Sequence, residues 1–449
     1  MRPADRRAPE RRGPRPEGAP AQRGPGPRRP DPRDLDRRAP EPDTRGPSEP
    51  RPPERRALAH APGEITLHGP RELAEPLAEA LALATELDPD TLTHGFHVWP
   101  GRMHRALARR LLELLVPRPG ATVVDPFVGG GTVAVEGLVR GHRVIALDAN
   151  PLSALVVRVK TRLTSADDRE AFHVLVQHLV AQSLERVRER RPALAKLHGE
   201  HLVLYGPHVL KELAGLLEEI RGLDGQPIDI ADREAALAIF SSLTAKLSNK
   251  RADTAEDEIR KRIRKGLPTE LFERKAEELI ERWDALADAA RGTRGAVETG
   301  TADARFLPQV LQDRRAGLCD LVLTSPPYGG TYDYAAQHAL RLDWLGLPWA
   351  PFERAEIGAR RHGGEAARWD DELGRSLAAM RAVLRGPASR VALVLGDAQL
   401  GARRIDAHQH VLALAPRVGL HPVAAASELR ADHLGGPPRR EHVIVLAPR

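Results

Sequence analysis

Cysteine is almost missing from this sequence of 449 residues, since Cys319 is the only one. A single cysteine allows no disulfide within the chain and no zinc cluster built from thiolates, which fits a reducing compartment. The 18 histidines show no spacing that suggests a metal site. No apolar run approaches the roughly 20 residues that a membrane helix requires, and the N-terminus lacks the apolar core of a secretory signal. We therefore expect a cytoplasmic protein without a metal or a membrane span.

Apolar and charged residues, in contrast, are both abundant. Hydrophobic residues make up 41% of the chain, and charged residues make up 29% with a formal net charge of +6. The length suits one large α/β domain with an insertion, or two ordinary domains. The basic balance permits a polyanionic partner such as nucleic acid but does not require one, because a solvated surface also accounts for most charge.

Residues 1–60 are rich in proline, arginine and glycine and nearly lack apolar side chains. Such a stretch cannot bury enough surface to offset its conformational entropy, so we expect a disordered tail. Its arginines either keep the protein soluble or hold nucleic acid loosely, and the first interpretation is favoured.

The pattern beyond the tail predicts a Rossmann-like α/β sheet of seven strands. A strand, a glycine turn, a helix and a second strand form a βαβ unit, which indicates a parallel sheet. The last two strands are expected to form an antiparallel hairpin at the edge. Helices are predicted at about 72–88, 102–116 and 132–141, and strands at 121–127, 142–149, 295–304, 319–327, 389–397, 421–429 and 440–448.

Residues 152–295 are almost wholly helical in pattern and separate the second predicted strand from the third. We interpret this block as an insertion that acts as a lid or recognises the substrate. Residues 61–151 then hold the N-terminal helices and the first half of the sheet domain, and residues 296–449 hold its second half.

A glycine-rich turn, DPFVGGGT, joins the first strand to its helix from Asp125 to Thr132. Glycines such as Gly129 and Gly131 let the backbone approach a ligand closely, and the helix N-terminus offers free N–H groups. Asp148 closes the second strand, where a carboxylate can accept both ribose hydroxyls of an adenosine. We therefore expect a nucleoside-bearing cofactor across the carboxyl ends of the first two strands.

More than one interpretation fits this turn. The spacing from Gly129 to Ala134, with Asp148 downstream, satisfies a relaxed dinucleotide fingerprint, and a purely structural tight turn is a further alternative. Asp125 suits a cationic ligand better than a pyrophosphate, because S-adenosylmethionine carries an ammonium and a sulfonium. Phe127 either presents its π face to that cation or belongs to the core.

Ser325, Pro326, Pro327 and Tyr328 follow an apolar strand directly. Two consecutive prolines cannot continue a ladder, so they force a rigid turn at the carboxyl end of the strand, where α/β sheets place their chemistry. The Ser325 hydroxyl and the Pro326 carbonyl are acceptors that favour an electron-rich nitrogen when they face the N–H groups of a base amine. Tyr328 offers a flat face to an extruded base. A strand that simply ends in a Pro-Pro turn is the alternative.

With both motifs in view, the chain resembles the S-adenosylmethionine-dependent amino-methyltransferases that modify DNA at cytosine N4 or adenine N6. Its Ser-Pro-Pro-Tyr form is closer to the N4-cytosine branch than the Asp-Pro-Pro-Tyr form usual for adenine. The resemblance implies that Phe96, Trp99 and Pro100 lie in a segment that closes over the methionine end of the cofactor. It implies further cofactor contacts by Asp125, Phe127, Gly129, Gly131, Thr132, Asp148, Asn150 and, at the adenine amino group, Asp303.

The resemblance covers roughly residues 92–155 and 296–449, and the helical block matches no target-recognition domain of the family. RNA base methyltransferases, of guanine N2 or adenine N6, share the logic of the proline turn and form the first alternative. A catalytically silent nucleic-acid-binding relative is the second, but its glycine or proline turn would be broken. A nicotinamide oxidoreductase is the third, and it gives Ser-Pro-Pro-Tyr no role.

A basic loop inside the helical block is one candidate for contact with nucleic acid. Lys246, Lys250 and Arg251 precede the charged run AEDEIRKRIRK, which we expect to form a helix. Asp253 or Thr254 can cap that helix, with Asp257 as a partner, and the basic face beyond can contact phosphates at the same time.

A second candidate follows the proline turn. Tyr332 and Tyr334 lie just beyond it, and Arg360 and Arg361 lie in the next loop. Aromatic residues beside a basic loop suit base stacking and backbone contact, and buried packing of one tyrosine is the alternative.

Overall fold

The computed structural model describes residues 63–84, 88–251, 258–362, 366–400, 403–430 and 438–449. The predicted tail of residues 1–60 lies outside the described residues, and so do the predicted caps Asp253, Thr254 and Asp257. Within these ranges, no helix combines the length and the apolar character needed to cross a membrane.

The elements follow the predicted order closely. The strands are β1 (Ile65–His68), β2 (Thr122–Asp125), β3 (Arg143–Asp148), β4 (Ala296–Thr301), β5 (Leu321–Thr324), β6 (Arg390–Gly396), β7 (Ala398–Leu400), β8 (Arg403–Ile405), β9 (Leu420–Arg430) and β10 (Arg439–Pro448). The α-helices are α1 (Arg71–Leu83), α2 (Arg105–Leu115), α3 (Thr132–Val139), α4 (Pro151–Lys160), α5 (Ala166–Glu189), α6 (Gly199–Leu202), α7 (Pro207–Gly222), α8 (Ile230–Leu247), α9 (Leu267–Ala289), α10 (Leu307–Asp313), α11 (Tyr334–Leu345), α12 (Trp349–Ala355), α13 (Ala366–Ala382) and α14 (Ala407–Leu414). Short 3-10 helices are η2 (Ala304–Phe306), η3 (Arg360–His362) and η4 (Ala415–Val418).

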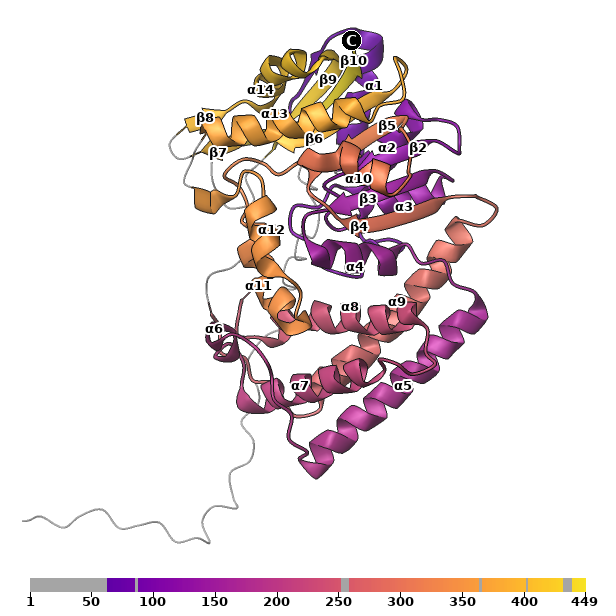
Figure 1. The fold of residues 1–449 in the computed structure, drawn as a ribbon, viewed down its shortest axis with the longest axis vertical. Coiled ribbons are helices and arrows are strands. Elements are labelled where there is room, and N and C mark those ends of the chain that lie inside the picture. The colour runs from indigo at the N-terminus through magenta and orange to yellow at the C-terminus, as the bar shows by residue number, and fades with distance from the viewer. Residues whose placement is uncertain (1–62, 85–87, 252–257, 363–365, 401–402, 431–437) are drawn as a thin grey trace, which may run out of the picture. The chain divides into compact units, whose positions relative to one another are not determined.

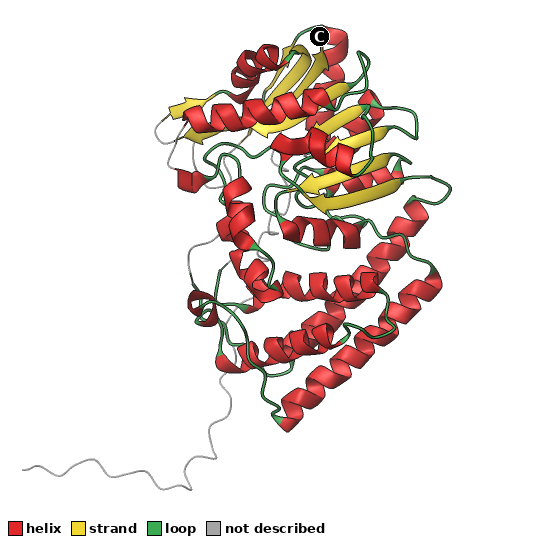
Figure 2. Cartoon of the chain, in the orientation of Figure 1, coloured by secondary structure: helices red, strands yellow, loops and turns green. Residues whose placement is uncertain are grey.

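Eight of the described strands form one sheet in the order β1-β9-β10-β6-β5-β2-β3-β4. Figure 2 shows the strands in yellow, with helices packed around them. The strands β4, β3, β2, β5 and β6 pair in parallel, whereas β10 pairs antiparallel with both β6 and β9. This is the Rossmann-like methyltransferase sheet that the sequence predicts, and all seven expected strands are present. The eighth strand, β1, was not predicted; it is a four-residue strand that pairs antiparallel with β9, too short for a clear pattern.

Helices cover both faces of the sheet (Figure 1). Alternate residues along each strand point to opposite faces, so Val123 of β2 packs in the core under α1, α2 and α3. Its neighbour Val124 packs in the core under α10, α13 and α14. Helix α4 contacts β3 and β4, as expected of the helix that follows the second strand.

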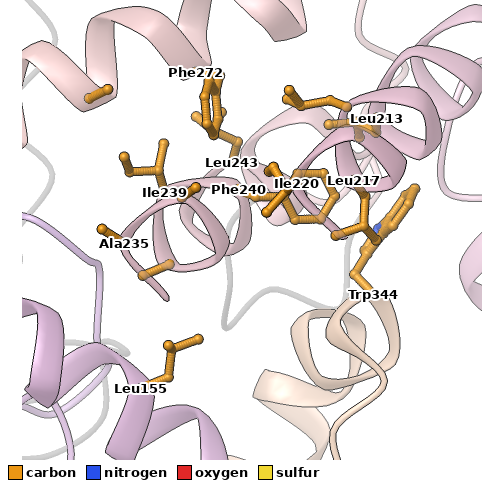
Figure 3. Close-up of a cluster of buried hydrophobic side chains, with 14 of the residues drawn as sticks. Leu155, Leu213, Leu217, Ile220, Ala235, Ile239, Phe240, Leu243, Phe272 and Trp344 are labelled. Carbon is orange, nitrogen blue, oxygen red and sulfur yellow. The ribbon is translucent and has the colours of Figure 1, made fainter. Parts of the chain in front are cut away.

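The helices α5 to α9, which we call the insertion, lie below the sheet in Figure 1. They pack around an apolar core that they share with α4 and α11, in which Phe240 and Phe272 are fully buried. Figure 3 shows Trp344 of α11 in the same cluster as Leu217 and Phe240. The indole N–H of Trp344 donates to the hydroxyl of Tyr205 at 2.9 Å. Because α11 follows the proline turn, the insertion anchors the segment that leaves this turn.

The helix predicted for AEDEIRKRIRK is wrong for residues 258–265, which are extended instead. The backbone N–H of Ile259 donates to the carbonyl of Asn249 at 2.7 Å. Ile263 packs against the core of the insertion, while its neighbours Arg262 and Arg264 are exposed. In a helix, residues such as Arg260 and Arg264 would form like-charge pairs four positions apart, which are destabilising.

Candidate active site

The strand order reverses between β2 and β5, so the loops beyond these strands diverge and leave a crevice at their carboxyl ends. Thr324, at the end of β5, donates its hydroxyl to Oδ1 of Asp125, at the end of β2, at 2.6 Å. The same oxygen accepts from the backbone N–H of Phe127 at 3.1 Å. Burial nevertheless raises the pKa of Asp125 to about 7. Both strand ends are predicted to carry chemistry, and the fold brings them into contact.

The glycine turn follows Asp125 and allows another chain segment to approach it closely. Gly129 has φ of 48°, in the left-handed region that favours glycine. A Cβ on Gly129 would lie 2.9 Å from Nε1 of Trp99, and a Cβ on Gly130 would lie 2.9 Å from Cβ of Trp99. Trp99 therefore packs directly against the turn, and its role at the methionine end of a cofactor stays a prediction.

Asp148 ends β3 and fixes the same turn from the other side. Its Oδ2 accepts from the N–H of Gly129 at 2.8 Å, and its Oδ1 accepts from the N–H of Asn150 at 2.9 Å. Burial raises the pKa of Asp148 to about 6. The side chain of Asn150 caps α4 through the N–H of Leu152, and its amide nitrogen lies 2.7 Å from Nδ1 of His338 on α11.

Lys160 was not recognised from the sequence, although it joins two cofactor segments. Only 1% of the residue is exposed, and its ammonium donates to the carbonyls of His94 at 3.1 Å and Gly130 at 2.9 Å. Burial, with the nearby positive charge of Arg102, holds the pKa of Lys160 well below its ordinary value. A lysine in the last turn of an apolar helix is usually explained by the helix dipole, so no pattern distinguishes this one.

One cavity brings the predicted motifs together at the carboxyl edge of β2, β3 and β5. Its lining comes from the segment before α2, the glycine turn, the end of β3, the proline turn and the start of α11. Predicted site residues that line it are Trp99, Pro100, Asp125, Phe127, Gly129, Thr132, Asp148, Asn150, Ser325, Pro327 and Tyr334. Residues not singled out before include Arg102, Met103, Val128, Gly130, Phe352 and Glu356.

Glu356 is, with Arg102, one of two charged residues in this lining that no sequence pattern indicated. It is buried, and its two oxygens accept from the N–H groups of Tyr334 at 2.6 Å and Ala335 at 3.2 Å, at the start of α11. Arg361 pairs with it at 2.6 Å and also with Asp333 at 2.6 Å. Burial raises the pKa of Glu356. Arg361, which we predicted to contact nucleic acid, is therefore engaged within the fold in this structure.

Some predicted cofactor residues do not line the cavity. Phe96 is buried in the core shared with the insertion, and the ammonium of Lys275 lies 5.4 Å from its ring centroid. Asp303 caps η2 and pairs with the guanidinium of Arg305 at 2.6 Å. Gly131 is not part of the cavity lining, and its N–H closes the turn by donating to the Val128 carbonyl at 2.8 Å.

The predicted nucleic-acid residues fall into two places. The ring of Tyr332 lies 5.2 Å from that of Tyr334, beside the cavity, and the exposed Arg360 lies in η3. In contrast, Lys246 is at the exposed end of α8 in the insertion, and Lys250 and Arg251 follow it. The fold thus divides these residues between the sheet edge and the insertion.

Pro326 is buried and Tyr328 is partly buried, and neither is part of the cavity lining. The hydroxyl of Tyr328 donates to Oε1 of Glu441 on β10 at 2.9 Å. Glu441 pairs with Arg430, and Arg430 pairs with Glu428 at 2.6 Å. No more than 5% of any of these three charged residues is exposed. They lie at the polar ends of β9 and β10, on two strands, so the sequence did not indicate that they meet beside the proline turn.

Residues 97–181 match the profile of a family described as the RMKL-like methyltransferase domain. Together with the strand order and the two turns, this match makes the sheet domain similar to the S-adenosylmethionine-dependent methyltransferases. The residues of the cavity fit that cofactor, because two carboxylates suit its cationic and hydroxyl groups and the glycine turn leaves room beside the backbone.

Two curated proteins show which members of this class the chain is similar to. One is the type II methyltransferase M.MvaI of Kocuria varians, 42% identical over 72 residues, which are 16% of this chain and 16% of that protein. Another is ribosomal RNA small subunit methyltransferase H of Anaeromyxobacter sp. (strain K), 41% identical over 81 residues, or 16% of this chain and 26% of the relative. The matched part therefore spans about a sixth to a quarter of the length of these relatives.

Similarity to solved structures is weak. The rRNA methyltransferase aviRa from Streptomyces viridochromogenes aligns with a TM-score of 0.32 and 14% identity, over 80% of this chain and 93% of that one. TrmN from Thermus thermophilus aligns with a TM-score of 0.30 and 17% identity, over 78% of this chain and 50% of that one. Alignments at this level carry no argument about function.

Proposed function

We propose that the protein transfers the methyl group of S-adenosylmethionine to an exocyclic amino group of a nucleic-acid base, with cytosine N4 of DNA favoured over adenine N6. One observation carries the proposal. Ser325 and Pro327 of the proline turn line the same cavity as Asp125, Gly129 and Asp148. A group bound at the glycine turn and an amine at the proline turn would therefore meet in one space.

The residues of the chain have distinct tasks in this reaction. The bound cofactor supplies an electrophilic methyl group. The Ser325 hydroxyl and the Pro326 carbonyl accept from the N–H groups of the base, which raises the electron density on its nitrogen. That nitrogen bonds to the methyl carbon as the carbon–sulfur bond breaks, and it then releases one proton. Tyr328, whose hydroxyl is held by Glu441, offers its ring to the base.

The choice of DNA and cytosine rests on the Ser-Pro-Pro-Tyr form and on the similarity to a type II methyltransferase. A second candidate is an RNA base methyltransferase. The similarity to ribosomal RNA small subunit methyltransferase H favours it, because that match is almost as high in identity and slightly longer.

The two candidates are separated by offering cofactor with a tritiated methyl group to DNA and RNA in parallel. The labelled nucleoside is then identified by mass. We expect N4-methyldeoxycytidine from DNA. Label in RNA alone would replace the first candidate by the second, and label in neither would contradict the proposed activity.

The role of the proline turn is tested with Ser325→Ala and Tyr328→Ala. Loss of base stacking should lower kcat/KM for Tyr328→Ala by about 10- to 100-fold, since stacking contributes roughly 1–3 kcal/mol. Ser242→Ala, which removes a hydroxyl from α8 in the insertion, serves as the control. If both turn variants transfer methyl groups as fast as this control, the proline turn is not the reaction site.

A further inference from the structure

A second cavity, of about 360 Å³, lies within the insertion. It is bordered by the end of α5, the first turns of α7 and the residues just before α9. Five of its lining side chains are cationic, and one is an acid. They are Arg186, Arg190, Arg191, Lys211, Lys265 and Glu212.

Three of these cations are left over after the internal ion pairs are formed. Arg186 pairs with Glu218 and Glu219, and Arg191 pairs with Glu185 and Glu189. Within the described part of the chain, Arg190, Lys211 and Lys265 have no ion pair, and all three are exposed.

The acid in the lining does not offset this excess of positive charge. The side chain of Glu212 is buried, and its oxygens accept from the N–H groups of Gly266 at 2.9 Å and Thr269 at 3.1 Å, at the start of α9. Its charge is therefore directed into the fold and matched by the N-terminus of a helix. The cavity opens to solvent with a net positive lining.

The basic character continues along the extended segment 258–265, which ends at Lys265. Arg260 and Arg262 of this segment are exposed, and the ring of His208 in α7 holds the segment by a 2.6 Å contact to the carbonyl of Ile263. The cavity and the segment thus form one continuous basic surface that includes residues from α5, α7 and the loop before α9.

We infer that this surface binds the backbone phosphates of the nucleic-acid substrate away from the site of methyl transfer. The inference rests on the proposed function, because it assumes a polyanionic substrate. Exposed lysine and arginine side chains without internal partners contact phosphates at little desolvation cost, and a planar guanidinium such as that of Arg190 can do so with two hydrogen bonds. Helix α11 extends from the proline turn into the core of the insertion, so this surface is anchored to the site of methyl transfer.

The test uses the full chain with Lys211→Glu and Lys265→Glu combined. Binding is measured by fluorescence anisotropy on a DNA duplex of roughly 40 base pairs, and on RNA of the same length, over a series of KCl concentrations. Each lost phosphate contact lowers the slope of log Kd against log salt by about 0.9, so we expect the slope to fall by about 2. Kd at low salt should rise about tenfold or more.

A matched control reverses two charges elsewhere, with Arg375→Glu in α13 and Arg417→Glu in η4, both exposed. It changes the net charge by the same amount as the test variant. Because neither residue belongs to the basic surface, the slope of log Kd against log salt should stay unchanged. Binding of S-adenosylhomocysteine, measured by calorimetry, verifies that both double variants are folded.

The failures of the two proposals are distinguishable. If the natural protein binds DNA or RNA and both double variants bind equally well, the inferred surface is wrong and the proposed function stands. An equal loss in both double variants would show a general effect of charge and would also overturn the inference. If the natural protein binds neither nucleic acid at any salt concentration, the proposed function fails together with the surface.

Discussion

The glycine turn and the proline turn lie at the ends of adjacent strands, but different interactions hold them. The glycine turn is fixed mainly by its own backbone and by that of β3: Val128 donates to the carbonyl of Leu147 at 2.9 Å and accepts from Gly131 at 2.8 Å. One buried cation, Lys160, supports it. The proline turn instead rests on charged side chains from β9 and β10 through the contact between Tyr328 and Glu441.

The difference shows which interactions fix the conformation of each turn. Glycines and a following helix specify the glycine turn locally, so most substitutions elsewhere leave it intact. The proline turn depends on a buried ionic network whose members are distant in sequence, and such networks fail as a unit when one member is removed. We therefore expect remote substitutions to damage the proline turn more than the glycine turn.

The largest effect is expected for Glu441→Ala. The substitution removes Glu441 from the buried guanidinium of Arg430, which also pairs with Glu428, and breaking a buried pair costs about 3 to 5 kcal/mol. It also removes the acceptor of the Tyr328 hydroxyl. Urea-induced unfolding should show this loss, and methyl transfer should fall even where the variant remains folded and binds S-adenosylhomocysteine.

Two milder variants separate the roles of Glu441. Glu441→Gln keeps an acceptor for Tyr328 but removes the charge, whereas Tyr328→Phe keeps the network and removes only the hydroxyl. We expect the first to lose mainly stability and the second to lose mainly kcat. Equal stability of Glu441→Ala and the natural protein would show that the network does not support the turn.

A smaller loss is expected when the glycine turn itself is changed, in Gly131→Val. Gly131 has φ of 85°, and a Cβ there would lie 3.0 Å from Cγ2 of Val157. A β-branched residue in this conformation costs about 1 to 3 kcal/mol, so the affinity for S-adenosylhomocysteine should fall by about 100-fold. Calorimetry measures the change.

The control for this substitution is Gly374→Ala in α13, where an added Cβ meets nothing within 4 Å. It should preserve cofactor binding and raise stability by up to about 1 kcal/mol, because alanine favours a helix. Unchanged binding by Gly131→Val would mean that the turn is not the cofactor site.

The positions of both turns in the fold were predictable from the sequence, because each turn is a local sequence pattern. An apolar strand followed by glycines or by two prolines identifies Asp125 and Ser325 as ends of strands, and parallel strands bring such ends to one edge. All seven strands could be predicted because each is likewise a local apolar run that ends in turn residues. The segment 258–265 was wrongly predicted as a helix because its pattern does not reveal its contacts with other segments: the carbonyl of Asn249 accepts from Ile259 at 2.7 Å, and the ring of His208 lies 2.6 Å from the carbonyl of Ile263.

The supporting residues were not predictable in the same way. Lys160, Glu356 and Glu441 lie near other charged residues, as Glu441 lies beside Arg440, so charge alone does not distinguish them in the sequence. Each gains its role from partners on other elements, such as the contact of Glu441 with Tyr328. No spacing within the chain encodes such contacts, so they become visible only when the fold is known.

Lys160→Met tests whether the buried cation beside the glycine turn contributes less to the stability of the fold than the ionic network beside the proline turn does. The substitution leaves the carbonyls of His94 and Gly130 without this donor, but it also removes the cost of burying an ammonium. We expect a loss of about 1 to 2 kcal/mol in unfolding by urea, less than for Glu441→Ala. The control Lys275→Met, beside Phe96, should lower the free energy of unfolding by less than Lys160→Met does. A loss above that of Glu441→Ala would reverse the comparison.

The smallest expected effect is the dependence of cofactor affinity on pH, which arises from the charge of Asp125 beside the glycine turn. Burial raises the pKa of Asp125 to about 7, so this carboxyl is largely protonated below that pH. A cationic cofactor prefers the ionised form, and its binding therefore releases a proton below pH 7. Affinity for S-adenosylmethionine should then rise by about tenfold from pH 6 to pH 8, and Asp125→Asn should flatten this profile. S-adenosylhomocysteine, which lacks the sulfonium charge, should show a shallower rise. Equal slopes for the two compounds would mean that Asp125 does not sense the charge of the sulfonium, and flat profiles for both would mean that it senses neither the sulfonium nor the ammonium.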